Sequence, residues 1–213
     1  MVIASTSNPL ADDFLKDALA RVAALPHLPD RIAWWTRHSH ADEAWFRDEL
    51  AFSLSRVYAG AFETHCEGGG NRYDIVVTDA SPDGAVPLSS LPTIAAIELK
   101  VHGNWYLVRR DVQRWVQQDL IKTSSAPVSA IALQACWHFV PQRGRRSAFA
   151  DLIRRQQGTE NSADLRDIFT AAAGRAPDFQ FETDCSKHED FAQLRLLTFG
   201  FLNRSATNGP LGV

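Results

Sequence analysis

The sequence predicts an α/β fold in which helices flank a mixed central β-sheet. Apolar residues recur with a helical period in some segments and with a strand pattern in others, in the order helix, three strands, helix, strand over roughly residues 40–140. A chain of 213 residues that is 45% hydrophobic can bury one substantial core. We therefore expect a single domain over residues 1–213, with an N-terminal helical extension at 8–38 and C-terminal helices and a strand at 147–203.

The N-terminal part of the chain is expected to be helical. The Asn-Pro pair that begins at Asn8 and the aspartates of the following turn are typical of a helix start, and this helix should end at Pro26. Residues 29–40 have no clear period and indicate a short helix or an ordered connector. A capping-box pattern then opens an amphipathic helix over residues 39–58.

Short apolar runs bounded by turn residues predict the sheet. The expected strands cover residues 61–66, 72–78, 93–101, 128–140 and 194–202. The last of them either completes the sheet or lies at its edge. Further helices are expected at residues 105–122, 147–157 and 162–173, and a short one after a capping-box pattern at Ser186 and Glu189.

Two charged residues interrupt the apolar strand at 93–101. Side chains alternate between the faces of a strand, so Glu98 and Lys100 project to one side while Leu99 projects to the other. Charges within an apolar strand are unfavourable unless they are paired, solvated or used for binding. The acidic-x-Lys tripeptide is weak by itself, because this composition gives roughly an even chance of one such match.

The surroundings of the tripeptide make it more specific. Asp74 begins the apolar run of the preceding strand, so strand pairing should bring it beside Glu98. The amphipathic helix upstream offers a third carboxylate, Glu49, at the border of its apolar face. Converging carboxylate oxygens suit a hard cation such as Mg²⁺, with Mn²⁺ as a substitute. A neighbouring lysine such as Lys100 can position an attacking water and offset charge on a phosphate, so we expect phosphodiester hydrolysis.

Together, these residues resemble the motif of the PD-(D/E)xK nuclease superfamily, which has the restriction-endonuclease-like fold. The resemblance covers the predicted core from the amphipathic helix to the fourth strand, about half of the chain. It implies that Asp74 and Glu98 bind metal, that Lys100 serves the nucleophilic water, and that an acidic helix residue is an auxiliary ligand. Glu43 competes with Glu49 for this last role, and we favour Glu49 because it lies near the middle of the helix.

One motif position differs and one further role is open. Tyr73 stands where the motif has a proline, a variation that is common in the superfamily. Similar nucleases often place a glutamine or a basic residue on the helix after the lysine strand, and Gln117 is our candidate there. A solvated helix face is the alternative for Gln117 and its polar neighbours. Arginines between residues 143 and 155 suit phosphate contacts, with solvated surface as the alternative.

We expect a magnesium-dependent endonuclease that cuts DNA, most simply as a symmetric dimer. The formal net charge of −3 argues against non-specific coating of nucleic acid. Three scattered cysteines without CxxC spacing fit a reducing cytoplasm, and no segment predicts a signal peptide or a membrane span. Two alternatives are a catalytically silent nuclease-fold module that binds nucleic acid or protein, and an RNA-cleaving toxin or defence effector.

Overall fold

The structure, a computed structural model, describes residues 8–37, 43–67, 73–80, 91–103, 109–142 and 162–203. These ranges contain five helices and six strands. In chain order the elements are α1 (Asp12–Ala23), α2 (Leu28–Arg37), α3 (Glu43–Tyr58), β1 (Phe62–Cys66), β2 (Ile75–Asp79), β3 (Thr93–Gly103), α4 (Arg109–Ser124), β4 (Ser129–Pro141), α6 (Ser162–Ala173), β5 (Phe179–Asp184) and β6 (Phe191–Leu202).

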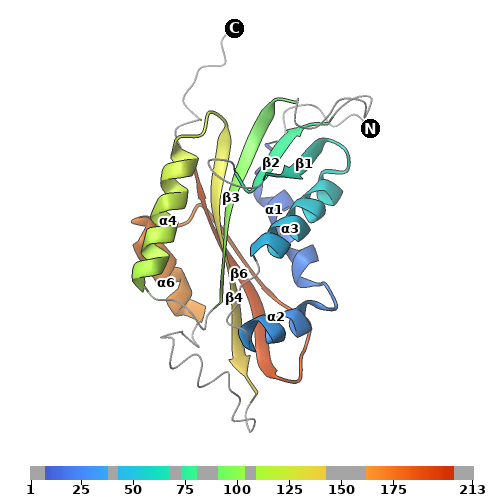
Figure 1. Ribbon diagram of the computed structural model, residues 1–213, viewed down its shortest axis with the longest axis vertical. Coiled ribbons are helices and arrows are strands. Elements are labelled where there is room, and N and C mark those ends of the chain that lie inside the picture. Colours follow the sequence, from blue (N-terminus) through green and yellow to red (C-terminus); the bar gives the residue numbers. More distant parts are fainter. Residues whose placement is uncertain are drawn as a thin grey trace.

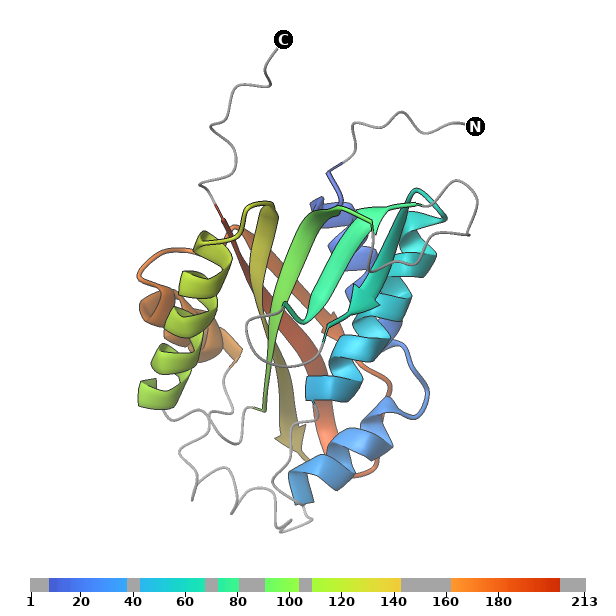
Figure 2. The same ribbon diagram turned by 45° about the horizontal axis from the view of Figure 1, so that its top comes forward.

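All six strands belong to one mixed sheet, in the order β1-β2-β3-β4-β6-β5. β3 and β4 run parallel, whereas every other neighbouring pair is antiparallel. A parallel pair needs a long crossover connection, and α4 lies in the connection between β3 and β4. The two parallel strands therefore lie in the middle of the sheet, and α3 lies along its β1 edge (Figure 2).

Helices cover both faces of the sheet, so the molecule has three layers (Figure 1). α1, α2 and α3 pack on one face, where the apolar cluster includes Leu99 and Trp137. α4 and α6 pack on the other face through a second cluster that includes Val116 and Phe169. Because successive side chains of a strand face opposite layers, the residues of β3 on either side of Leu99 lie on the side of α4.

Most of the predicted elements are confirmed. The order helix, three strands, helix, strand is present as α3-β1-β2-β3-α4-β4, and the described part of the segment at 29–40 is helical, as part of α2, which begins at Leu28. The predicted last strand is β6, which lies between β4 and β5 and not at the edge. The edge strand β5 was not predicted. The short helix expected after Ser186 is wrong, because His188 and Phe191 pair as a β-bridge that leads directly into β6.

Some predicted features lie outside the described residues. They are the capping box before α3, the helix at 147–157 and the arginines between residues 143 and 155. In the described part of the chain, no helix is long and apolar enough to cross a membrane.

Candidate active site

The site lies where β3 continues past the first residue of β2. The two strands pair antiparallel, with Ile75 opposite Ile97. The residues next to this pair are Asp74 and Glu98, and their carboxylates are close enough for Asp74 to raise the pKa of Glu98. The side chain of Asp74 extends the ladder, since its Oδ2 accepts a hydrogen bond from the Leu99 N–H at 2.8 Å. The predicted proximity of Asp74 and Glu98 is thus present in the fold.

A second carboxylate contacts the same edge of β3. Glu43, the first residue of α3, accepts a long hydrogen bond from the Val101 N–H at 3.4 Å. The same oxygen, Oε2, lies 2.9 Å from the Nζ atom of Lys100. The Lys100 ammonium also lies 5.9 Å from the centre of the Trp115 ring on α4. A carboxylate and an aromatic face therefore hold this ammonium between α3 and α4.

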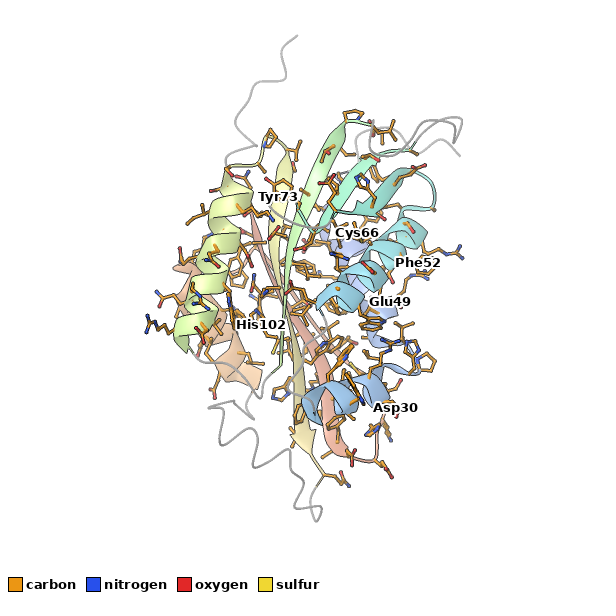
Figure 3. All side chains as sticks on the ribbon, in the orientation of Figure 1. Asp30, Glu49, Phe52, Cys66, Tyr73 and His102 are labelled. Atoms are coloured by element: carbon orange, nitrogen blue, oxygen red, sulfur yellow. The ribbon has the colours of Figure 1, made fainter. Side chains whose placement is uncertain are left out.

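Of the two helix carboxylates considered above, both within the described ranges, the structure brings Glu43 and not Glu49 to Lys100. Glu49 lies further along α3, by about 9 Å of helix axis at the usual rise per residue. Its position on α3 is labelled in Figure 3. The contact with Lys100 comes from the first turn of α3 and not from its middle, because α3 docks with its first turn against the end of β3.

A second lysine reaches the site from α4. The Nζ atom of Lys122 lies 2.6 Å from Glu98 Oε2 and 5.5 Å from the centre of the Tyr73 ring. The Tyr73 hydroxyl donates a hydrogen bond to the Lys122 carbonyl at 3.4 Å, so Tyr73 also ties the start of β2 to α4. Lys122 is absent from the predicted site. Two features of the sequence favour Lys122 as a site residue. Lysine is rare in this chain, and Lys122 lies two turns after Trp115 on the same face of the helix.

Three buried polar side chains next to Lys100, those of His102, Gln134 and Asp119, are joined by hydrogen bonds. Gln134 of β4, which is opposite Lys100 in the parallel ladder, donates from Nε2 to Asp119 Oδ2 at 2.7 Å. Its carbonyl oxygen lies 2.9 Å from His102 Nε2. Because a carbonyl only accepts, His102 carries its proton on Nε2. Burial lowers the pKa of His102 to about 4, so the ring is neutral in its place between the sheet and α4 (Figure 3).

Carboxylates outnumber lysines in this cluster. Two lysines face four carboxylates, those of Glu43, Asp74, Glu98 and Asp119. Burial raises the pKa of Glu98 to about 7, and repulsion from Asp74 and Asp119 adds to the rise while Lys122 opposes it. Burial also raises the pKa of Asp74, and it raises that of Asp119 to about 6. A bound cation would relieve this repulsion.

The donor set fits a hard divalent cation that keeps water. The bond to Leu99 uses one of the two Asp74 oxygens, so the pair Asp74 and Glu98 still offers carboxylate oxygen to an ion. Within the described ranges, no three His, Cys, Asp or Glu side chains converge on one point as a metal site. Magnesium suits such a sparse set, because it often binds one or two carboxylates and retains several waters.

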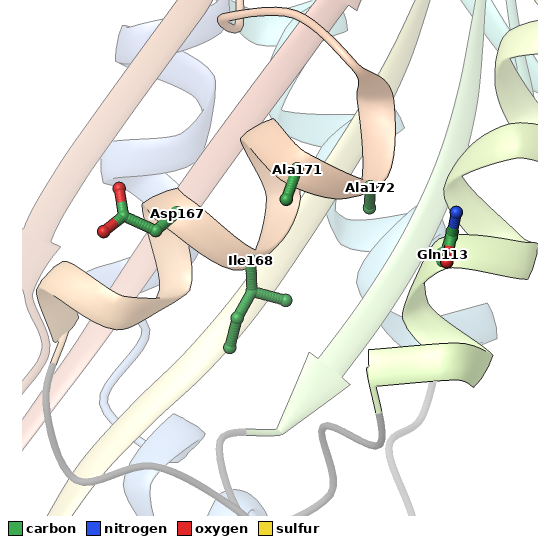
Figure 4. Close-up of a pocket in the computed structure, with 5 residues that line it drawn as sticks. All are labelled: Gln113, Asp167, Ile168, Ala171 and Ala172. Atoms are coloured by element: carbon green, nitrogen blue, oxygen red, sulfur yellow. The ribbon is translucent and has the colours of Figure 1, made fainter.

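Gln117 points away from these carboxylates. Its Nε2 donates to the Ala172 carbonyl at 2.6 Å, so this side chain joins α4 to α6. The role predicted for Gln117 near the scissile phosphate therefore has no support in the geometry. A hollow of about 310 Å³ lies between the same two helices (Figure 4) and is lined by Gln113, Asp167, Ile168, Ala171 and Ala172. It is separate from the carboxylate cluster.

Comparisons with protein-family models, with curated proteins and with solved structures find no match for this chain. A functional assignment therefore depends on the side chains of the carboxylate cluster and on the elements that carry them.

Proposed function

We propose that this protein is a magnesium-dependent endonuclease that hydrolyses phosphodiester bonds in DNA on a restriction-endonuclease-like core. The observation that carries the proposal is the pair of Asp74, directly before β2, and Glu98 on the neighbouring strand β3, with Lys100 two residues after Glu98 on the same side of β3. The element order α3-β1-β2-β3-α4-β4 agrees with the resemblance that these residues carry. The fold alone would not support a function, since one fold hosts many chemistries.

Asp74 and Glu98 are the residues that would hold Mg²⁺, which supplies a Lewis acid for the hydrolysis. Their raised pKa values fit this role, because each carboxylate lacks enough positive charge nearby to offset its burial. A ligand must be deprotonated to bind metal, so the affinity that Glu98 provides should fall as the pH drops below about 7.

Lys100 is the residue that would orient the attacking water and offset charge on the phosphate. Glu43 Oε2 lies 2.9 Å from the Lys100 ammonium. The Lys100 side chain is 31% exposed, so a substrate can reach Lys100. A fixed ammonium in a partly shielded site stabilises developing negative charge more than a mobile one in water does. Glu43 replaces Glu49 as the auxiliary carboxylate in this proposal, because it sets the position of Lys100.

A cleavage assay with the Lys100→Ala variant tests the proposal. The purified protein should nick or cut plasmid DNA when MgCl₂ is present, and Lys100→Ala should lose activity by at least about 100-fold, the scale for one electrostatic catalytic group. Circular dichroism should show that the variant keeps its fold. Lys16→Ala is the matched control, because Lys16 pairs with Asp12 on the surface of α1.

Two outcomes would overturn the proposal. Undiminished cleavage by Lys100→Ala would assign the activity to another site or to a contaminant. Salt-sensitive DNA binding without cleavage in either Mg²⁺ or Mn²⁺ would favour a catalytically silent member of the fold. Parallel assays on RNA separate a DNA endonuclease from an RNA-cleaving effector.

A further inference from the structure

Lys122 is a cation of the site that the proposed reaction does not use. Its ammonium lies 2.6 Å from Glu98 Oε2, and the two side chains are 26% and 13% exposed. The contact is thus a close, partly buried ion pair. It engages the Glu98 carboxylate, which the proposed function assigns to metal binding. A magnesium ion binds oxygen at about 2.0–2.1 Å. Such an ion and an ammonium on the same carboxylate would lie within a few ångströms of each other in a partly buried site, and like charges repel strongly there.

We propose that Lys122 is an internal cation that occupies Glu98 in the metal-free protein, and that a divalent metal must displace it to bind. The inference rests on the proposed metal site of Asp74 and Glu98. In the absence of metal, the ammonium offsets part of the repulsion that Glu98 meets from its carboxylate neighbours. The metal-free site is thereby stabilised, and metal binding is weakened by the free energy needed to break the ion pair.

Tyr73 gives the displaced ammonium a second place to interact. The Tyr73 ring centre lies 5.5 Å from the Lys122 Nζ atom, within the range of a cation–π contact. The hydrogen bond from the Tyr73 hydroxyl to the Lys122 carbonyl keeps the ring beside this turn of α4. Lys122 can therefore leave Glu98 by a change of side-chain rotamer and still lie against Tyr73. Tyrosine at this position, where the motif has proline, thus has a physical role.

Titration calorimetry with MgCl₂ or MnCl₂ alone tests the displacement. Lys122→Met should bind either ion about tenfold more tightly than the wild type, since the ion then breaks no ion pair. Lys122→Arg retains the charge and should bind like the wild type. Lys16→Met controls for the change in net charge, because it removes one positive charge from the surface of α1. Asp74→Asn should abolish the binding and so locate it at this site.

A second measurement uses the wild-type protein and so does not depend on the folding of a variant. Acylation of lysines, followed by mass spectrometry, should show Lys122 reacting several-fold faster when Mg²⁺ is added, with Lys16 as the internal reference. The displacement would be overturned if the wild type and Lys122→Met bound metal with equal affinity. It would also be overturned if added Mg²⁺ did not change the reactivity of Lys122. Either result would leave the proposed metal site in place. An absence of Mg²⁺ and Mn²⁺ binding in all variants would overturn both proposals.

Discussion

The carboxyl groups of Glu98 and Asp119 lie in buried surroundings that disfavour their charged form. The Glu98 side chain is 13% exposed and Asp119 is 8% exposed. Burial is the largest cause of the raised pKa of each group. Such groups lower the stability of a fold, and they are concentrated at sites where binding or catalysis requires them. Removal of the Glu98 charge should therefore stabilise the protein.

We predict that Glu98→Gln raises the thermal unfolding midpoint above pH 7 and leaves it near that of the wild type below pH 4.5. The pKa of Glu98 rises from 4.5 to about 7 on folding, so the folded wild type binds more protons than the unfolded chain between these values. Wild-type stability consequently falls as the pH rises through this window. The full penalty above it is roughly 2 kcal/mol after allowance for solvent screening, and glutamine avoids it.

Calorimetry at the two ends of this window measures the effect. Glu63→Gln, which makes the same substitution on β1, is the matched control. A Glu98→Gln midpoint below that of the wild type above pH 7 would contradict the prediction. It would mean that the ion pair with Lys122 stabilises the fold by more than the burial of Glu98 destabilises it.

At the scale of elements, strands were easier to predict than the docking of helices. Asp74, Glu98 and Lys100 could be predicted because neighbouring strands pair in chain order and alternation fixes which side chains share a face. Glu43 and Lys122 depend on the direction in which α3 and α4 lie on the sheet, which the periodicity of a helix does not specify. Periodicity finds the buried face of α3, but it does not show that the first turn meets β3.

A pair of isosteric variants on α3 tests this docking. Glu43→Gln should lower the DNA cleavage rate by roughly 10- to 100-fold, because loss of the ion pair frees the Lys100 ammonium from its position. Glu49→Gln should stay within about twofold of the wild type, since it leaves the ion pair between Glu43 and Lys100 intact. Both rates come from plasmid nicking under identical conditions. A larger loss in Glu49→Gln than in Glu43→Gln would restore Glu49 as the auxiliary carboxylate.

At the scale of the whole molecule, the core order was predictable but the C-terminal edge was not. β5 is a short edge strand whose outward residues Glu182 and Asp184 pair with Arg195 of β6, and only Phe179 and Phe181 carry the apolar half of its alternation. The apparent capping box at Ser186 instead lies in a turn, where His188 Nδ1 accepts a hydrogen bond from the Asp190 N–H. Side-chain-to-backbone bonds of this kind satisfy a turn as readily as a helix start.

The charge of the whole molecule also bears on how it would bind DNA. The chain has a formal net charge of −3, and the carboxylate cluster adds local repulsion where the proposed function would bring a phosphate. Repulsion between solvated charges fades over about 8 Å at physiological ionic strength. The local cluster should therefore oppose DNA binding more than the distant surface charges do.

We predict that binding of a DNA duplex depends on a divalent ion even without cleavage. Calcium takes the same oxygen ligands as magnesium in a looser geometry, so millimolar CaCl₂ should tighten binding by at least about tenfold. The double variant Asp74→Asn/Glu98→Gln should bind without metal about as tightly as the wild type does with calcium, because it lacks the two repelling charges. Fluorescence anisotropy with a labelled duplex measures both, with KCl adjusted to keep the ionic strength constant. Equal wild-type affinity with and without calcium would show that the carboxylates do not face the DNA, and the site would then have to act on a smaller phosphodiester.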